Sequence, residues 1–243
     1  MSEPVWQRFG DPDPRPGGIV ALCDHASNHV PAEIELGVPP ALLEAHIAWD
    51  IGAAGVVRQL AQRHGVPGHL AAVSRLVIDL HREEDHAKLI PEESDGHRIP
   101  GNVGADRQGR LARFHRPYHQ ALAAFLDAAQ PRLILSIHSF TPQMQSRPEE
   151  ERPWEVALLY NQDAAPAHHA IRLLEAEGLI VGDNQPYSGR DLNATMNRHA
   201  EAQGRRYLAI EIRNDQIATE AGQARWAALI ANIAGQVADG LGA

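Results

Sequence analysis

Three short apolar runs of this sequence each end in a side chain that can bind a metal ion or move a proton. Residues 18–23, 133–137 and 207–210 lead into His25, His138 and Glu211, respectively. Short β-branched runs bounded by turns are typical of buried strands. The carboxyl ends of parallel strands meet at one edge of a sheet, where α/β proteins bind their ligands. The sequence therefore predicts an active site in which two histidines and a glutamate converge.

The polar segment after the first run, DHASNH, offers several nitrogen and oxygen ligands within a single turn. One interpretation is a metal site that includes His25. The other is a polar loop in which Asp24 or Asn28 only caps the next turn. A second strand-end histidine, His138, favours the metal site, because a buried histidine left without a partner costs about 1–3 kcal/mol.

Glu211 interrupts an otherwise apolar run, since isoleucines flank it on both sides. An ionised carboxylate at such a position is costly unless a cation compensates it. Glu211 is therefore either the partner of an arginine, such as Arg213, or a general base that acts on a metal-bound water. Asp79 raises the same question, and there we favour an acceptor that orients a histidine or an arginine.

Arg75 and Arg82 flank residues 76–80, which we interpret as an interior strand. A guanidinium group can hold a carboxylate through two parallel hydrogen bonds. Because these two arginines frame a single crevice, they are the preferred ligands for a substrate carboxylate. Further arginines at strand ends or in loops are Arg98, Arg190 and Arg213.

The composition excludes several classes of protein. A formal charge of −9 disfavours nucleic acid as a partner. No apolar stretch approaches the roughly 20 residues that cross a bilayer, and the N-terminus does not resemble a signal peptide, so we expect a cytoplasmic protein. A single cysteine, Cys23, permits neither an internal disulfide nor a thiolate cage for zinc. Residues 1–243 are expected to form one domain.

Strands alternate with helices along the chain, which predicts an α/β fold with a mostly parallel sheet covered on both faces. One long helix is expected over residues 40–64, where Asp50 is either a cleft residue or a solvated one and Gly52 marks close packing. The other predicted helices cover residues 106–129, 164–177, 195–203 and 218–241, and the other predicted strands cover residues 69–73, 154–160 and 179–181.

The motifs CDHASN, SIHSFTP and IEIRND, in this order, resemble those of the N-formylglutamate amidohydrolase family. The resemblance extends from about residue 19 to residue 216. It implies a zinc-exopeptidase-like fold, with three α/β/α layers around a central, mostly parallel but mixed sheet, similar to zinc carboxypeptidases and aspartoacylases. It also implies a divalent metal cofactor, with zinc as the expected ion.

Carried over residue by residue, the resemblance assigns His25 and His138 as metal ligands and Glu211 as the catalytic glutamate. The position of the family's acidic ligand falls on Asn28, with Asp24 as the alternative. An amide is a weaker zinc ligand than a carboxylate. The resemblance thus implies a metal-assisted hydrolase whose third ligand is unusual.

The expected substrate is a small anionic acyl-amino acid, from which a formyl or other small acyl group is removed. The pair His81-Arg82 corresponds to an Asn-Arg pair that recognises the substrate carboxylate in the similar hydrolases. The residues expected to bind the substrate are Arg75, Arg82, Asn102 and Arg213. The alternative function is a non-catalytic module that binds an anionic metabolite in the same crevice. The oligomeric state is left open.

Overall fold

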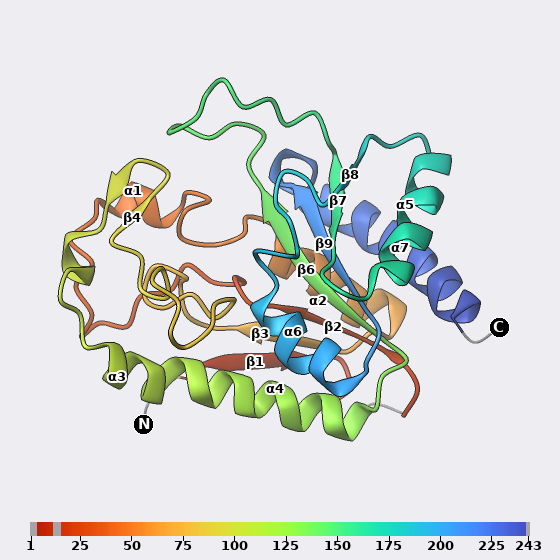
Figure 1. Ribbon diagram of the computed structural model, residues 1–243, viewed down its shortest axis with the longest axis horizontal. Coiled ribbons are helices and arrows are strands. Elements are labelled where there is room, and N and C mark those ends of the chain that lie inside the picture. Colours follow the sequence, from red (N-terminus) through yellow and green to blue (C-terminus); the bar gives the residue numbers. More distant parts are fainter. Residues whose placement is uncertain (1–3, 12–15, 242–243) are drawn as a thin grey trace.

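A computed structural model describes residues 4–11 and 16–241, and its centre is a twisted seven-stranded sheet (Figure 1). The strand order is β1-β3-β2-β6-β9-β7-β8. Neighbouring strands are parallel except for β1 with β3 and β7 with β9. The strands are β1 (Trp6–Phe9), β2 (Ile19–Cys23), β3 (Gly68–Ala71), β6 (Leu133–Phe140), β7 (Val156–Leu159), β8 (Val181–Asp183) and β9 (Tyr207–Arg213).

Helices cover both faces of this sheet and complete three layers (Figure 1). One core lies between the sheet and α2, α5 and α7. A second core lies between the opposite face and α4 and α6. The helices are α2 (Ala53–His64), α4 (Arg116–Ala129), α5 (Ala164–Ala176), α6 (Ala194–His199) and α7 (Glu220–Gly240). The predicted α/β/α architecture with a mixed, mostly parallel sheet is confirmed.

The alternation of side chains along the central strands directs the candidate site residues to one face. On β9, Leu208, Ile210 and Ile212 belong to the core beneath α2, α5 and α7. Because successive side chains point to opposite faces, Glu211 lies on the α4 and α6 face, where Tyr207 and Ala209 also lie. His138 pairs with Glu211 in the register of β6 and β9, so the two side chains emerge next to each other.

The single helix predicted over residues 40–64 is wrong. The chain forms α1 (Pro40–Leu43), then turns, and begins α2 only at Ala53. Gly52 adopts a φ of 83°, and a Cβ atom there would stand 2.3 Å from the carbonyl oxygen of Ile217. The close approach of a distant segment therefore sets the start of α2. It also places Asp50 in the turn before the helix, where its amide donates to His25 O.

The interior strand predicted over residues 76–80 is also wrong, because this buried segment consists of turns. Its carbonyl groups are satisfied by side chains instead of a neighbouring strand. The Asn102 amide donates to Leu76 O at 2.8 Å, and Arg110 donates to Val77 O at 2.7 Å. Buried backbone groups need such partners wherever no sheet supplies them. The apolar run thus indicates burial but not strand pairing.

The remaining predicted helices exist with small changes. The helix over residues 106–129 is divided into α3 (Arg107–Arg110), a π-helical segment (Leu111–His115) and α4. The loop before it carries a hairpin of β4 (Glu93–Ser94) and β5 (His97–Arg98), which was not predicted, nor was β1. Short 3-10 turns are Pro100–Asn102, Glu201–Gln203 and Asn214–Gln216. No helix among the described residues is long and apolar enough to span a membrane.

Replacing Gly52 by alanine tests the origin of this turn. We expect Gly52→Ala to lower the free energy of unfolding by about 1–3 kcal/mol more than Gly65→Ala, because its Cβ meets backbone. Gly65 is a matched control, since it also has a positive φ, 65°, but has no atom within 4 Å of the added Cβ. Urea denaturation measures both, and equal losses would contradict the steric explanation.

Candidate active site

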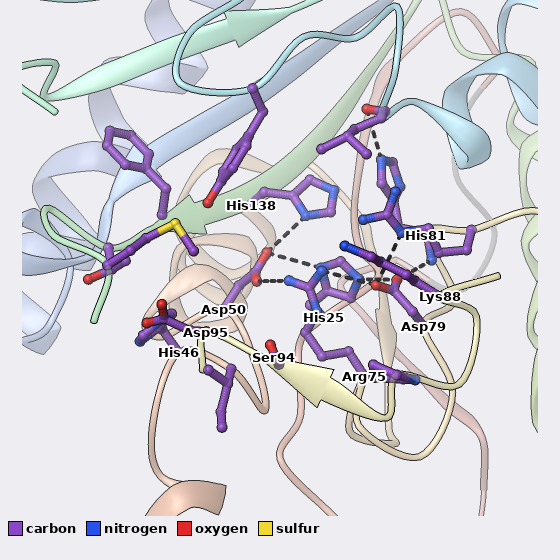
Figure 2. A pocket seen from close by; sticks show the side chains of 18 of the residues that line it. His25, His46, Asp50, Arg75, Asp79, His81, Lys88, Ser94, Asp95 and His138 are labelled. Carbon is purple, nitrogen blue, oxygen red and sulfur yellow. Dashed lines mark hydrogen bonds and ion pairs between the residues drawn. The ribbon is translucent and has the colours of Figure 1, made fainter. Parts of the chain in front are cut away.

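A cavity of about 830 Å³ opens at the carboxyl ends of the central strands. Its floor carries ionisable side chains that come from segments far apart in the sequence. His25 follows β2, His138 and Glu211 lie near the ends of β6 and β9, and Asp50 lies in the turn before α2. Figure 2 shows Asp50 between His25 and His138. The predicted convergence of strand-end residues is therefore present, with an aspartate added.

His25, Asp50 and His138 form a compact donor cluster. One ligand atom from each lies within 4.8 Å of the others, and all three residues are buried. The Asp50 Oδ2 atom is 3.4 Å from His25 Nδ1 and 2.9 Å from His138 Nδ1. Two imidazole nitrogens and one carboxylate oxygen are a donor set typical of a catalytic zinc-type site, which leaves further positions open. The cluster is thus a candidate metal site.

The second nitrogen of His25 is held by a carboxylate. His25 Nε2 lies 2.7 Å from Asp79 Oδ1. Figure 2 shows the two side chains facing each other. Such a carboxylate fixes the tautomer of a metal-binding histidine and turns its other nitrogen toward the ion. The predicted role of Asp79, as an acceptor that orients a histidine or an arginine, agrees with this contact.

The protonation of His25 also fits a metal site. Burial and the Arg75 charge lower its pKa, but the Asp79 and Asp50 carboxylates outweigh them and raise it to about 9. In the metal-free protein the ring is therefore an imidazolium held between two carboxylates. A divalent cation at Nδ1 would replace this proton, as is usual when a metal binds to a preformed site.

Another group of possible ligands, Asp24, His81 and His138, is less suited to an ion. The Tyr118 hydroxyl donates to Asp24 Oδ1 at 2.6 Å, and His81 Nδ1 lies 2.9 Å from Asp24 Oδ2. Asp24 is also absent from the described residues that line the cavity. We therefore assign Asp24 to the support of His81.

Glu211 is a further ionisable residue that lines the cavity. Its side-chain atom Oε2 is buried without a hydrogen-bond partner among the described residues. Burial, reinforced by the nearby Asp50 carboxylate, raises the pKa of Glu211 to about 8. A carboxyl group with a pKa near neutrality can both accept and return a proton, as general acid–base catalysis requires.

Of the residues expected to bind substrate, Arg75 and Arg82 line the cavity. Arg75 donates to Asp50 at 3.3 Å and to Asp79 at 3.0 Å. Arg82 Nε lies 3.6 Å from Asp79. Arg75 and Arg82, which form the cationic side of the cavity, are therefore held in place by the carboxylates that surround His25.

The structure does not bring the other predicted residues to the cavity. The Asn28 amide donates to Leu43 O at 2.9 Å, away from the histidines. Asn102 supports the buried turns of residues 76–80, and Arg213 is paired with Asp215 at 2.8 Å. None of the three is among the described residues that line the cavity. The carboxylate next to His25 and His138 belongs to Asp50, whereas the family resemblance assigned the third ligand to Asn28 or Asp24.

Arg152 and Tyr187 are functional candidates that the sequence did not reveal. All five N–H groups of Arg152 have acceptors: Glu150 takes two, and Thr141 O, the Met144 sulfur and the Tyr187 hydroxyl oxygen take one each. Arg152 is therefore saturated. Tyr187 lines the cavity and accepts from Arg152 at 3.0 Å, so its own proton remains to be donated. Both residues come from turn-rich loops, where no periodicity of the sequence indicates which way a side chain points.

The fold and this site define a class of α/β proteins with a buried His/Asp cluster at the carboxyl edge of a mixed sheet. Residues 17–218 match the family model described as N-formylglutamate amidohydrolase. The chain therefore belongs to the N-formylglutamate amidohydrolase family, and the predicted resemblance is confirmed. No curated protein matches the chain.

Two solved structures are similar over nearly the whole chain. A gene product of Agrobacterium tumefaciens is 29% identical, with a TM-score of 0.90 over 98% of this chain and 96% of its own. N-formylglutamate amidohydrolase from Ralstonia eutropha JMP134 is 20% identical, with a TM-score of 0.71 over 97% of each chain. The similarity to the Ralstonia eutropha structure shows that the two chains share a fold.

Metal analysis can separate the two candidate third ligands. We expect Asp50→Ala to lose stoichiometric divalent metal, because it removes the only carboxylate between His25 Nδ1 and His138 Nδ1 in the described structure. Asn28→Ala should keep the metal, since its amide contacts Leu43 O. Elemental analysis of protein purified without chelators measures both variants. Metal loss in Asn28→Ala with retention in Asp50→Ala would reverse the assignment.

Glu211 should destabilise the metal-free protein as the pH rises. Its pKa is raised from 4.5 to about 8, so the folded state retains a proton that the unfolded state releases. Its contribution to stability is full below pH 4.5 and is lost as the pH rises to about 8. The melting temperature of Glu211→Gln should therefore increasingly exceed that of the parent over this range, by about 2–4 °C per kcal/mol. A constant difference would contradict the shifted pKa.

Proposed function

We propose that this protein is a metal-dependent amidohydrolase that removes a formyl or other small acyl group from the nitrogen of an acidic amino acid. The observation that carries the proposal is the buried cluster of His25, Asp50 and His138 in one cavity with Glu211, whose Oε2 has no hydrogen-bond partner among the described residues. Membership of the N-formylglutamate amidohydrolase family supports hydrolysis of a carbon–nitrogen bond.

His25, Asp50 and His138 would hold the ion, and we propose zinc because the donor set is nitrogen and oxygen from buried residues. A divalent ion there would polarise the scissile carbonyl and lower the pKa of water. Asp79 contributes by fixing the orientation of His25. The cluster needs no ligand from residue 28.

Glu211 acts as the general base. It takes a proton from the attacking water and passes it to the departing amine, and a pKa of about 8 allows both transfers near neutral pH. Tyr187 can donate a hydrogen bond from its hydroxyl group to the carbonyl oxygen of the substrate, because Arg152 donates to the Tyr187 oxygen and leaves the O–H free. A fixed donor of this kind favours the developing negative charge.

Arg75 and Arg82 hold the carboxylates of the substrate from the wall of the cavity. Binding that charge orients the amide bond relative to Glu211, so the contacts serve turnover as well as affinity. Asn102 and Arg213 support the surrounding loops instead. A non-catalytic binding module would need no metal ligands, so the carboxylate of Asp50 beside His25 and His138 supports the hydrolase over that alternative.

The test is hydrolysis of N-formyl, N-acetyl and N-carbamoyl derivatives of acidic and neutral amino acids, followed by release of free amine. We expect the parent to prefer acidic N-formyl or N-acetyl substrates. Glu211→Gln should keep its metal and lower kcat by at least about a hundredfold, the lower range for a lost general base. Glu175→Gln, on an exposed position of α5, is the matched control. A fully active Glu211→Gln protein would overturn the proposal.

A further inference from the structure

The hairpin of β4 and β5 is tied to a loop that lies far from it in the sequence. At its tip Asp95 has a φ of 45° and Gly96 a φ of 80°, so both residues of the turn are left-handed, as type I′ hairpins require. The Asp95 carboxylate accepts hydrogen bonds from Ser146 N at 2.8 Å, Ser146 Oγ at 2.6 Å and Gln145 N at 2.9 Å. His46 Nε2 lies 3.0 Å from the same carboxylate. We call these four residues the Asp95 clasp.

The Asp95 side chain is shielded from solvent although it sits on a surface hairpin and its partners Gln145 and Ser146 are exposed. Only 2% of the Asp95 side chain is exposed. Burial alone would raise its pKa, but the hydrogen bonds from Ser146 and Gln145 outweigh it and lower the pKa to about 2. The carboxylate is therefore ionised at neutral pH, and its hydrogen bonds are of the stronger, charge-assisted kind.

The clasp forms part of the cavity wall. His46, Asp95 and Ser146 are lining residues, together with Met144 of the same loop. Figure 2 shows His46 and Asp95 on the side of the cavity away from His81 and Lys88. The wall that contains the Asp95 clasp therefore lies opposite the cationic side of the cavity. A substrate whose carboxylates bind on the cationic side would have this wall at its other end.

The hairpin in this wall is not rigid by itself. The hairpin contains only two residues in each strand, and an isolated two-stranded hairpin is at best marginally stable. The hydrogen bonds of the Asp95 clasp, with a contact of 2.8 Å between His97 Nε2 and Gln145 Oε1, join it to the loop. Removing the carboxylate should loosen this wall without touching the buried metal cluster.

We propose that the Asp95 clasp determines specificity by closing this side of the cavity, so that amino acids with short acyl groups fit and those with long acyl chains do not. The proposal rests on the proposed function for the class of substrate. A longer chain that runs away from the cationic side would have to pass between the hairpin and the loop, which the clasp holds together.

Binding measurements in a Glu211→Gln background test the proposed selection by acyl length without consuming the ligand. The probes are N-formyl-L-glutamate and N-octanoyl-L-glutamate, measured by calorimetry. Adding Asp95→Ala should strengthen octanoyl binding at least about tenfold relative to formyl binding, a change of the size that pocket shape commonly produces. Glu149→Gln, at an exposed position of the loop that carries Ser146 and outside the lining of the cavity, should leave the ratio unchanged. Ser146→Ala, which removes only one of the hydrogen bonds, should shift the ratio less but in the same direction.

Hydrogen exchange gives a second readout that does not depend on any ligand. The amides of Gln145 and Ser146 should exchange faster in Asp95→Ala than in Glu149→Gln. Unchanged exchange overturns the claim that the Asp95 clasp holds the loop. Faster exchange with an unchanged affinity ratio overturns the proposed selection by acyl length. Equal affinity of the parent for both probes, or no binding of either, also overturns it. Absence of hydrolysis by the parent protein, which retains Glu211, would defeat the proposed function separately, because the ratio is measured without turnover.

Discussion

The site depends on one buried carboxylate held between two histidines. Asp50 lies 2.9 Å from His138 Nδ1 and 3.4 Å from His25 Nδ1, and its charge also contributes to the raised pKa of Glu211. A buried carboxylate is costly without cations around it. Its ion pair with Arg75 and its contacts with the histidines supply that compensation. The arrangement is suited to a divalent cation, which would add positive charge where carboxylates are concentrated.

The backbone around Asp50 is fixed by contacts that serve no chemistry themselves. Gly52 lets the chain pass against Ile217, and this contact starts α2 after Asp50 instead of before it. The turns of residues 76–80 similarly depend on Asn102 and Arg110, and they carry Asp79 to His25. Irregular segments thus position the polar residues, while the central strands position His138 and Glu211.

Much of the fold could be predicted because its signals are local. Apolar runs identified the central strands, and helical periodicity identified α4, α5 and α7 within a few residues. The runs failed where a buried segment is neither strand nor helix, as in residues 76–80. The single helix predicted over residues 40–64 was wrong because helix propensity contains no information about Ile217, which packs against Gly52.

The sequence by itself determined that His25, His138 and Glu211 stand at strand ends, because burial and alternation are properties of consecutive residues. It also determined the family, through motifs whose order is readable along the chain. Only the tertiary structure decided that Asp50 completes the cluster and that Asn28 turns away. The physical reason is that a ligand set depends on distances between atoms, and those distances are set by contacts between segments remote from one another in the sequence.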